Sequence, residues 1–163
     1  MFRQMLKIKQ LLKEEDLQAV MRRCTAGTLA CIGDEGYPYS VPLSYVYHNG
    51  KIYYHSAKLG HKMDAIRANP KVSFSVIDED TIVSAEYTTY FRSAIAFGTA
   101  RITEGDERID GFKALVEKYS GDQPEDAKIK EIMGCTGALI IAIDVEHITG
   151  KEAIKYVKAK KQQ

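Results

Sequence analysis

The chain has 163 residues, of which 45% are hydrophobic, so it is long enough for one well-packed domain and too short for two. Its 23 basic and 22 acidic residues give a net charge of +1, which excludes the strongly basic face of a nucleic-acid-binding protein. No apolar run approaches the ~20 residues of a membrane-spanning helix, and the first residues lack the apolar core of a signal peptide. We therefore expect a single cytoplasmic domain over residues 1–163, with a lysine-rich, frayed tail at 156–163, that binds neither nucleic acid nor membrane.

Several kinds of catalytic site have no motif in this chain. The three cysteines form no Cys-x-x-Cys pair, and their odd number argues against a disulfide framework. The four histidines are scattered, without the His-x-x-x-His spacing of a helical metal site. The sequence also contains no Gly-x-Ser-x-Gly elbow, no Walker loop and no Gly-x-Gly-x-x-Gly fingerprint. A metal centre, nucleophilic hydrolysis, nucleotide hydrolysis and Rossmann-type dinucleotide binding are all disfavoured.

The first predicted element is a helix that opens at 13–16 and closes at 22–23. Its acidic residues come first and its basic residues last, as the helix dipole favours. Beyond this helix the chain is rich in strand patterns, which predict six strands over residues 27–32, 39–47, 51–56, 72–77, 90–102 and 138–145. Strands joined by hairpins, with one helix inserted after the third, favour a mainly β fold: a six-stranded antiparallel barrel with peripheral helices.

Short signals mark the connections between these strands. Asn49–Gly50 suits the positive dihedral angles of a tight hairpin. The acidic run 78–80 predicts a turn after the fourth strand, and Gly98 predicts a bulge or bend inside the fifth. No internal repeat or low-complexity linker interrupts the pattern, which again indicates one domain.

The predicted strand over 39–47 alternates regularly. Its odd-numbered positions are apolar or aromatic and share one face, and Pro42 lies on the other face. Because proline removes a hydrogen-bond donor from a sheet, we expect Pro42 at an edge or a bulge. Either it simply protects an exposed edge, or the unpaired backbone beside it meets a planar heteroaromatic ligand.

The helix that follows residues 53–60 begins with unusual chemistry. It ends at Asn69–Pro70, an ordinary stop signal. Helix N-termini attract acidic side chains, yet His61 and Lys62 stand at this start. The two side chains either point into water at a small energetic cost, or they bind an anion together with the free backbone N–H groups and the Ser56 hydroxyl.

The other predicted helices obey the dipole rule. Asp106–Glu107 opens a helical run that continues through Tyr119, with Lys118 near its end. Residues 149–152 have the Thr-x-x-Glu spacing of a capping box, which predicts a helix start there.

Two longer stretches carry a family resemblance. The segments DEGYPYSVPLSYVYHNGKIYYHSAKLGHKMDAIRANPKVSFSV and TTYFRSAIAFGTARI resemble the pyridoxamine 5'-phosphate oxidase-like, FMN-binding split-barrel proteins. The match is closest to the nitroimidazole-resistance branch and extends from about residue 1 to residue 154. The resemblance implies a homodimer of six-stranded split barrels, with FMN in the cleft between subunits.

The resemblance also implies a role for individual residues. Gly60, His61 and Lys62 match the segment that binds the FMN phosphate, which would explain the basic helix start. The remaining cofactor-binding residues that it implies are Val41, Pro42, Leu43, Ser44, Tyr54, His55, Ser56, Arg92 and Ser93. The C-terminal Arg and Trp with which true pyridoxamine phosphate oxidases hold substrate and cofactor have no counterpart here, so we do not expect vitamin B6 oxidation.

The function that this resemblance implies is flavin redox chemistry on a small-molecule substrate, such as a nitroaromatic compound. The cofactor would carry the electrons while the protein supplies binding and orientation. His55 is the candidate proton donor, and the alternative is a hydrogen-bonded structural histidine at a strand end. A non-catalytic flavin or haem carrier, or a redox sensor, remains the second hypothesis, because a fold alone does not decide the function.

Overall fold

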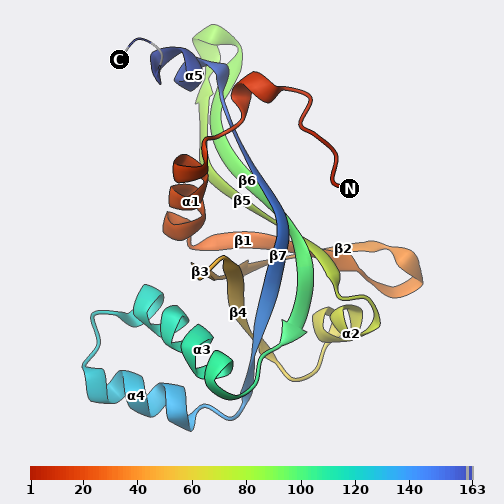
Figure 1. Cartoon of the computed structure of the whole chain (residues 1–163), viewed down its shortest axis with the longest axis vertical. Coiled ribbons are helices and arrows are strands. Elements are labelled where there is room, and N and C mark those ends of the chain that lie inside the picture. Colours follow the sequence, from red (N-terminus) through yellow and green to blue (C-terminus); the bar gives the residue numbers. More distant parts are fainter. Residues whose placement is uncertain (161, 163) are drawn as a thin grey trace.

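A computed structural model of the chain describes residues 1–160 and 162. Within this described part, one antiparallel sheet of seven strands has the order β2-β1-β5-β6-β7-β4-β3 (Figure 1). The strands are β1 (Ala26–Ile32), β2 (Pro38–Ser44), β3 (Val46–His48), β4 (Lys51–Ala57), β5 (Lys71–Val83), β6 (Thr88–Ile102) and β7 (Ala138–Glu152). The helices are α1 (Glu14–Arg23), α2 (His61–Ala68), α3 (Gly105–Ser120), α4 (Glu125–Gly134) and α5 (Ile154–Lys160), with short 3-10 turns at Ile8–Gln10, Asp34–Gly36 and Ser84–Glu86.

The sheet forms an incompletely closed barrel. Its two outermost strands, β2 and β3, are consecutive in the chain and are separated only by Tyr45. The sheet must therefore curl until its edges approach each other, although β2 and β3 do not pair. The predicted mainly β split barrel is confirmed. The strand count is seven rather than six because the predicted strand 39–47 breaks at Tyr45.

The seam at Tyr45 is held by a side chain from α3. The Tyr119 hydroxyl accepts a hydrogen bond from the backbone N–H of Tyr45 at 3.0 Å. The same hydroxyl lies within donating distance of the carbonyl oxygens of Tyr45 and Thr25. The side chain of Tyr45 is fully buried, and its own hydroxyl donates to the Met21 carbonyl of α1 at 2.8 Å. Two helices thus fix the point where the barrel stays open.

Three strands are longer than predicted and form the long ribbon that runs the height of Figure 1. The predicted turn at 78–80 is wrong, since β5 continues to Val83 after a register shift between Ile77 and Glu79. The predicted helix start at 149–152 is also wrong, because these residues belong to β7 and pair with β6 up to Arg92↔Glu152. Pairing with a long neighbouring strand outweighs the local capping signal there. The predicted irregularity at Gly98 is confirmed by a register shift between Phe97 and Gly98.

The helices predicted to open at 13–16, after residue 60 and at 106–107 are confirmed as α1, α2 and α3. Helix α4 was not predicted, and α5 begins at Ile154, after the strand that replaces the predicted capping box. None of the helices in the described residues combines the length and the apolar character that crossing a bilayer requires. In that same part of the chain, no group of His, Cys, Asp and Glu side chains is arranged to hold a metal ion.

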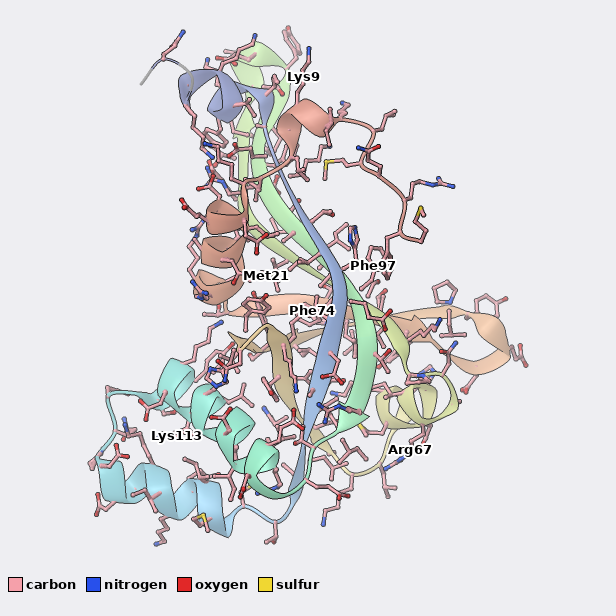
Figure 2. The ribbon with its side chains drawn as sticks, in the orientation of Figure 1. Lys9, Met21, Arg67, Phe74, Phe97 and Lys113 are labelled. Atoms are coloured by element: carbon pink, nitrogen blue, oxygen red, sulfur yellow. The ribbon has the colours of Figure 1, made fainter. Side chains whose placement is uncertain are left out.

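The hydrophobic side chains form two separate cores. The larger core fills the barrel under α1 and α2 and includes Met21 and Phe74, which Figure 2 labels where α1 meets the sheet. The smaller core lies between the α3–α4 hairpin and the outer face of β4 and β7, and it includes Tyr53, Phe112 and Ile140. The two faces of β4 thus serve different cores, and any residue of β4 faces either the barrel interior or the helical hairpin.

Candidate functional site

The site is built first around the start of α2. Gly60 precedes this helix with φ of 116°, a backbone conformation that side chains disfavour. The Gly60 carbonyl accepts hydrogen bonds from the N–H groups of Met63 and Asp64. The N–H groups of His61 and Lys62 precede these and have no partner inside the helix. This end of α2 therefore presents free donors and the positive end of a helix dipole.

Lys62 brings a cation without a counter-ion to this helix start. Its ammonium lies 5.3 Å from the centroid of the Tyr54 ring. Burial lowers the pKa of Lys62, which means that the protein environment opposes its charge. Among the described residues, no carboxylate forms an ion pair with it. A partly buried ammonium without a carboxylate partner, carried by a residue whose own backbone N–H is free at the helix start, is suited to an anion.

His61 is oriented by an aromatic contact rather than left free in water. Its ring stacks on Tyr39 of β2 with 4.1 Å between the centroids. Its Nε2 lies 3.8 Å from the exposed Asp34 carboxylate, too far for a hydrogen bond. The stacking ties the start of α2 to the first half of β2, so these two parts of the predicted site are adjacent.

Two predicted residues of β4 lie inside the barrel. Tyr54 is fully buried and Ser56 nearly so. The Tyr54 hydroxyl has no hydrogen-bond partner among the described residues, and burial raises the pKa of this phenol. A ligand on the outside of the barrel can meet these two residues only through their backbone atoms. The sequence placed both at the site without distinguishing backbone from side-chain contact.

Strand β2 is an edge strand, as the proline predicts. Val41 and Leu43 pack against the barrel core, whereas Pro42 and Ser44 are exposed. The strand runs from Tyr39, beside α2, to Ser44, a span of about 17 Å at ~3.3 Å per residue. The exposed edge of β2 thus connects the start of α2 with the region around Ser44.

A pocket of about 510 Å³ opens at this far end of β2. Ser44 and the exposed His55 of β4 form its strand side. The helical hairpin forms the rest, with lining residues Phe112, Leu115, Val116, Tyr119, Ser120, Gln123, Ala127, Lys128 and Glu131. We call this the α3–α4 pocket. Ser44 and His55, which were predicted from the sequence as cofactor-binding residues, both line this pocket. The lining residues from α3 and α4 were not predicted.

The comparison with known families agrees with this geometry. The family model described as pyridoxamine 5'-phosphate oxidase matches residues 13–152, which is most of the chain. The chain belongs to this family. The resemblance seen in the sequence is therefore confirmed.

Three known proteins are similar to this chain in sequence or in fold. An uncharacterised protein of Rhizobium meliloti is 28% identical over 153 residues, covering 88% of this chain and 95% of that protein. A candidate 5-nitroimidazole antibiotic resistance protein from Bacteroides thetaiotaomicron has a similar structure, with a TM-score of 0.71 and 21% identity over 86% of this chain and 85% of that one. A FAD and haem binding protein from Mycobacterium smegmatis has a TM-score of 0.69 and 18% identity, covering 93% of this chain and 80% of that one.

Arg92 and Ser93 lie apart from the other predicted residues of this family member. Helix α2 leads into the Lys71 end of β5, which pairs with Thr99 of β6. Arg92 lies seven positions before Thr99 on β6, which is about 23 Å from Thr99 at ~3.3 Å per residue. Its guanidinium is already engaged by Asp78, Glu79 and Glu152. Contact of Arg92 and Ser93 with a flavin stays a prediction, and their own chain does not bring them to the start of α2.

The pocket wall was missed in the sequence because its residues look like core residues. Phe112, Leu115 and Val116 have the spacing of an ordinary buried helix face. The acidic start of α4 after Pro124 was the available signal for a second helix, and a helical hairpin with a short loop would have followed from it.

Proposed function

We propose that the protein binds FMN along the exposed edge of β2, with the phosphate at the start of α2. The observation that carries the proposal is Lys62, a partly buried ammonium without a carboxylate partner beside the free N–H groups of the helix. A phosphate supplies the missing negative charge and accepts these donors. Gly60 allows close approach because its position carries no side chain and a Cβ there would meet nothing within 4 Å.

The rest of the cofactor fits the distance between the two parts of the site. From Tyr39 to Ser44, β2 spans about 17 Å, comparable to an extended flavin mononucleotide from phosphate to ring. The backbone of Val41 to Ser44 lies at a sheet edge and has unpaired groups for the ribityl chain and the ring. The tricyclic ring would then lie near Ser44 and His55, at the mouth of the α3–α4 pocket.

We further propose that the protein is an oxidoreductase for small nitroaromatic compounds. A bound flavin that a nicotinamide had reduced by hydride transfer would supply two electrons and one proton, and with a second proton from the protein these would convert a nitro group to a nitroso group and water. His55 is exposed and borders the pocket, so its imidazole can deliver a proton to a nitro oxygen. Among the described hydrogen bonds, none involves the His55 side chain, which favours this role over that of a structural histidine.

An apolar outer face of the sheet supports the proposed homodimer. Ile77 is 71% exposed, and Ile95 and Phe97 on the neighbouring strand project from the same face. Phe2 packs on Phe97 with 5.5 Å between the ring centroids. A hollow of about 430 Å³ lies between this aromatic pair and β1. An exposed apolar face of this kind is typical of an interface, and a two-fold dimer is the commonest closed assembly.

The structural likeness to a FAD and haem binding protein supports a second candidate. In that case the chain would carry a flavin or a haem without turning over a substrate. The absorbance spectrum of the purified protein separates the two, since flavin bands lie near ~370 and ~450 nm whereas haem gives a Soret band.

The deciding experiment is a titration of the protein with FMN, FAD and riboflavin. We expect FMN to bind about ten- to a hundredfold more tightly than riboflavin, the effect of a charge-assisted contact of ~1.5–3 kcal/mol. Equal binding of riboflavin would contradict the phosphate site. Multiple turnovers of a nitroaromatic compound with NAD(P)H would support the enzyme, and bound flavin that stays oxidised would support the carrier.

A further inference from the structure

The α3–α4 pocket has an apolar wall along α3. Phe112, Leu115 and Val116 face β4 and belong to the smaller hydrophobic core. Each is buried to about nine tenths or more, so the wall is fixed by packing against the sheet. On the opposite side, Ser44 and His55 supply polar groups from two different strands. A volume of about 510 Å³ is enough for a small ring system.

The cation in the wall of this pocket is already neutralised. Lys128 of α4 is buried, with its ammonium 2.9 Å from the carboxylates of both Glu117 and Glu125. The hydrogen bond that Lys128 donates to Glu117 is the largest cause of its raised pKa, so the ammonium stays charged and paired. Glu131 adds a third carboxylate on the exposed side of the same wall. Lys128, Glu117, Glu125 and Glu131 together carry a net charge of −2 at neutral pH.

We propose that the α3–α4 pocket is the substrate site of the flavin chemistry proposed above, and that it takes a small uncharged aromatic ring and rejects anionic ones. The ring packs on Phe112, Leu115 and Val116 with its reducible group toward His55 and Ser44. A carboxylated or phosphorylated ring meets the carboxylate of Glu131, and among the described lining residues it finds no lysine or arginine that lacks a carboxylate partner. Specificity thus comes from repulsion of the wrong substrate as well as from apolar contact with the right one.

Calorimetric binding of two matched probes tests this proposal: nitrobenzene, which is uncharged, and 4-nitrobenzoate, which carries a carboxylate. We expect nitrobenzene to bind at least about tenfold more tightly, equivalent to ~1.4 kcal/mol. Glu131→Lys should narrow this preference by about five- to tenfold, because it replaces a repulsive charge by an attractive one. Val116→Trp should weaken nitrobenzene about tenfold by filling the pocket. Equal binding of the two probes to the wild type would overturn the proposal.

Two control variants isolate the pocket. Glu15→Lys makes the same charge change at an exposed position of α1 and should leave the preference unchanged. Ile129→Trp adds the same ring to α4 at a position that is 53% exposed and outside the pocket lining. If Val116→Trp fails to fold, the exposed Glu131→Lys variant decides alone, and an unchanged preference in it overturns the proposal.

The same proteins titrated with FMN keep the two proposals separable. If the probes behave as expected but FMN does not bind, the results support binding of uncharged rings in the α3–α4 pocket and contradict the flavin function. If FMN binds but neither pocket variant alters probe binding, the flavin function stands and the pocket assignment fails.

Discussion

Lys62 and Arg92 lie in the same barrel but in opposite electrostatic surroundings. Arg92, where β6 meets the end of β7, is surrounded by the carboxylates of Asp78, Glu79 and Glu152. Lys62, at the start of α2, has an aromatic ring beside its ammonium and, within the described residues, no carboxylate partner. Both residues were predicted from the sequence to bind the cofactor, and only the structure distinguishes them.

The difference separates a structural cation from one that is available to a ligand. Around Arg92, the chain itself supplies every counter-charge: Asp78 also pairs with Arg23, and Glu152 also pairs with Lys160. Removing a member of such a buried network lowers the free energy of unfolding. Around Lys62 the counter-charge is missing, so removing the ammonium should affect ligand binding and leave folding nearly intact.

The largest effect that we predict concerns the neutralised region. Asp78→Asn removes a carboxylate whose side chain is 8% exposed and leaves Arg23 and Arg92 without it. We expect the free energy of unfolding to fall by ~3 kcal/mol, seen as a decrease of roughly 6–12 °C in Tm. FMN affinity of the folded variant should not change. A matched decrease in the exposed control Glu15→Gln would show that the network is not responsible.

The next effect concerns the cation without a partner. Lys62→Ala should weaken FMN about ten- to a hundredfold, since a charge-assisted contact contributes ~1.5–3 kcal/mol. Without FMN, the Tm should stay equal or rise slightly, because a positive charge is removed from the positive end of a helix. His61→Ala should cost less FMN affinity, because a neutral imidazole donates a single hydrogen bond.

Flavin titrations and thermal melts of the apo protein check both halves of this prediction. Lys113→Ala is the control, since this lysine lies on the exposed side of α3, away from α2 (Figure 2). Unchanged FMN affinity in Lys62→Ala would mean that Lys62, like Arg92, is not available to the cofactor.

A smaller effect is expected at Tyr54, beneath Lys62. Tyr54→Phe removes a buried hydroxyl that has no partner among the described residues. Loss of this desolvation cost should raise the free energy of unfolding by ~1 kcal/mol, or about 2–4 °C in Tm. A lower Tm would indicate that the hydroxyl does have a hydrogen-bond partner in solution, which would weaken the contrast with the Arg92 region.

The smallest effect concerns a neutralised cluster of partly exposed side chains, Lys51, Arg101 and Glu107. Hydrogen bonds from Arg101, and then from Lys51, lower the pKa of Glu107 to about 2. A folded-state pKa below the unfolded value means that this stabilisation is complete above pH 4.5 and is lost as the pH falls towards 2. Glu107→Gln should therefore cost about 0.5–1 kcal/mol of unfolding free energy at neutral pH and much less at pH 2, where about half of the Glu107 carboxylates in the folded protein are protonated. Urea melts at several pH values measure this, and a cost that does not depend on pH would contradict the charge assignment.

Local patterns were enough to predict most of the barrel. The hairpin at Asn49–Gly50 and the stop at Asn69–Pro70 depend on neighbours in the sequence, and the structure agrees with both. The alternation over 39–47 is also found, although the single strand predicted there is divided at Tyr45 into β2 and β3. The extension of β5 was missed because the acidic run 78–80 resembles a turn, although Val83 pairs with the nearby Thr88. The extension of β7 was missed because it depends on pairing with β6, which lies far away in the chain, as in the pair Arg92↔Glu152. The capping signal at 149–152 failed for the same reason.

The part of the site at the start of α2 could be predicted from the sequence. The parts that depend on tertiary packing could not. His61 and Lys62 are adjacent in sequence, so their unusual position could be recognised there. The orientation of Tyr54 into the barrel follows from the strand register, which the sequence does not show. The engagement of Arg92 depends on Asp78 and Glu152, which come from two other strands.

The Tyr119 contact at the open seam also links ligand binding to local backbone stability. Tyr119 lines the α3–α4 pocket, and its hydroxyl bonds the N–H of Tyr45 between β2 and β3. A ring bound in the pocket packs against α3 and opposes its movement away from the sheet. Because local opening of a segment sets the exchange rate of its amides, the Tyr45 amide should exchange with deuterium more slowly when the pocket is filled. The exchange rate of the Tyr45 amide would therefore show whether the pocket is occupied.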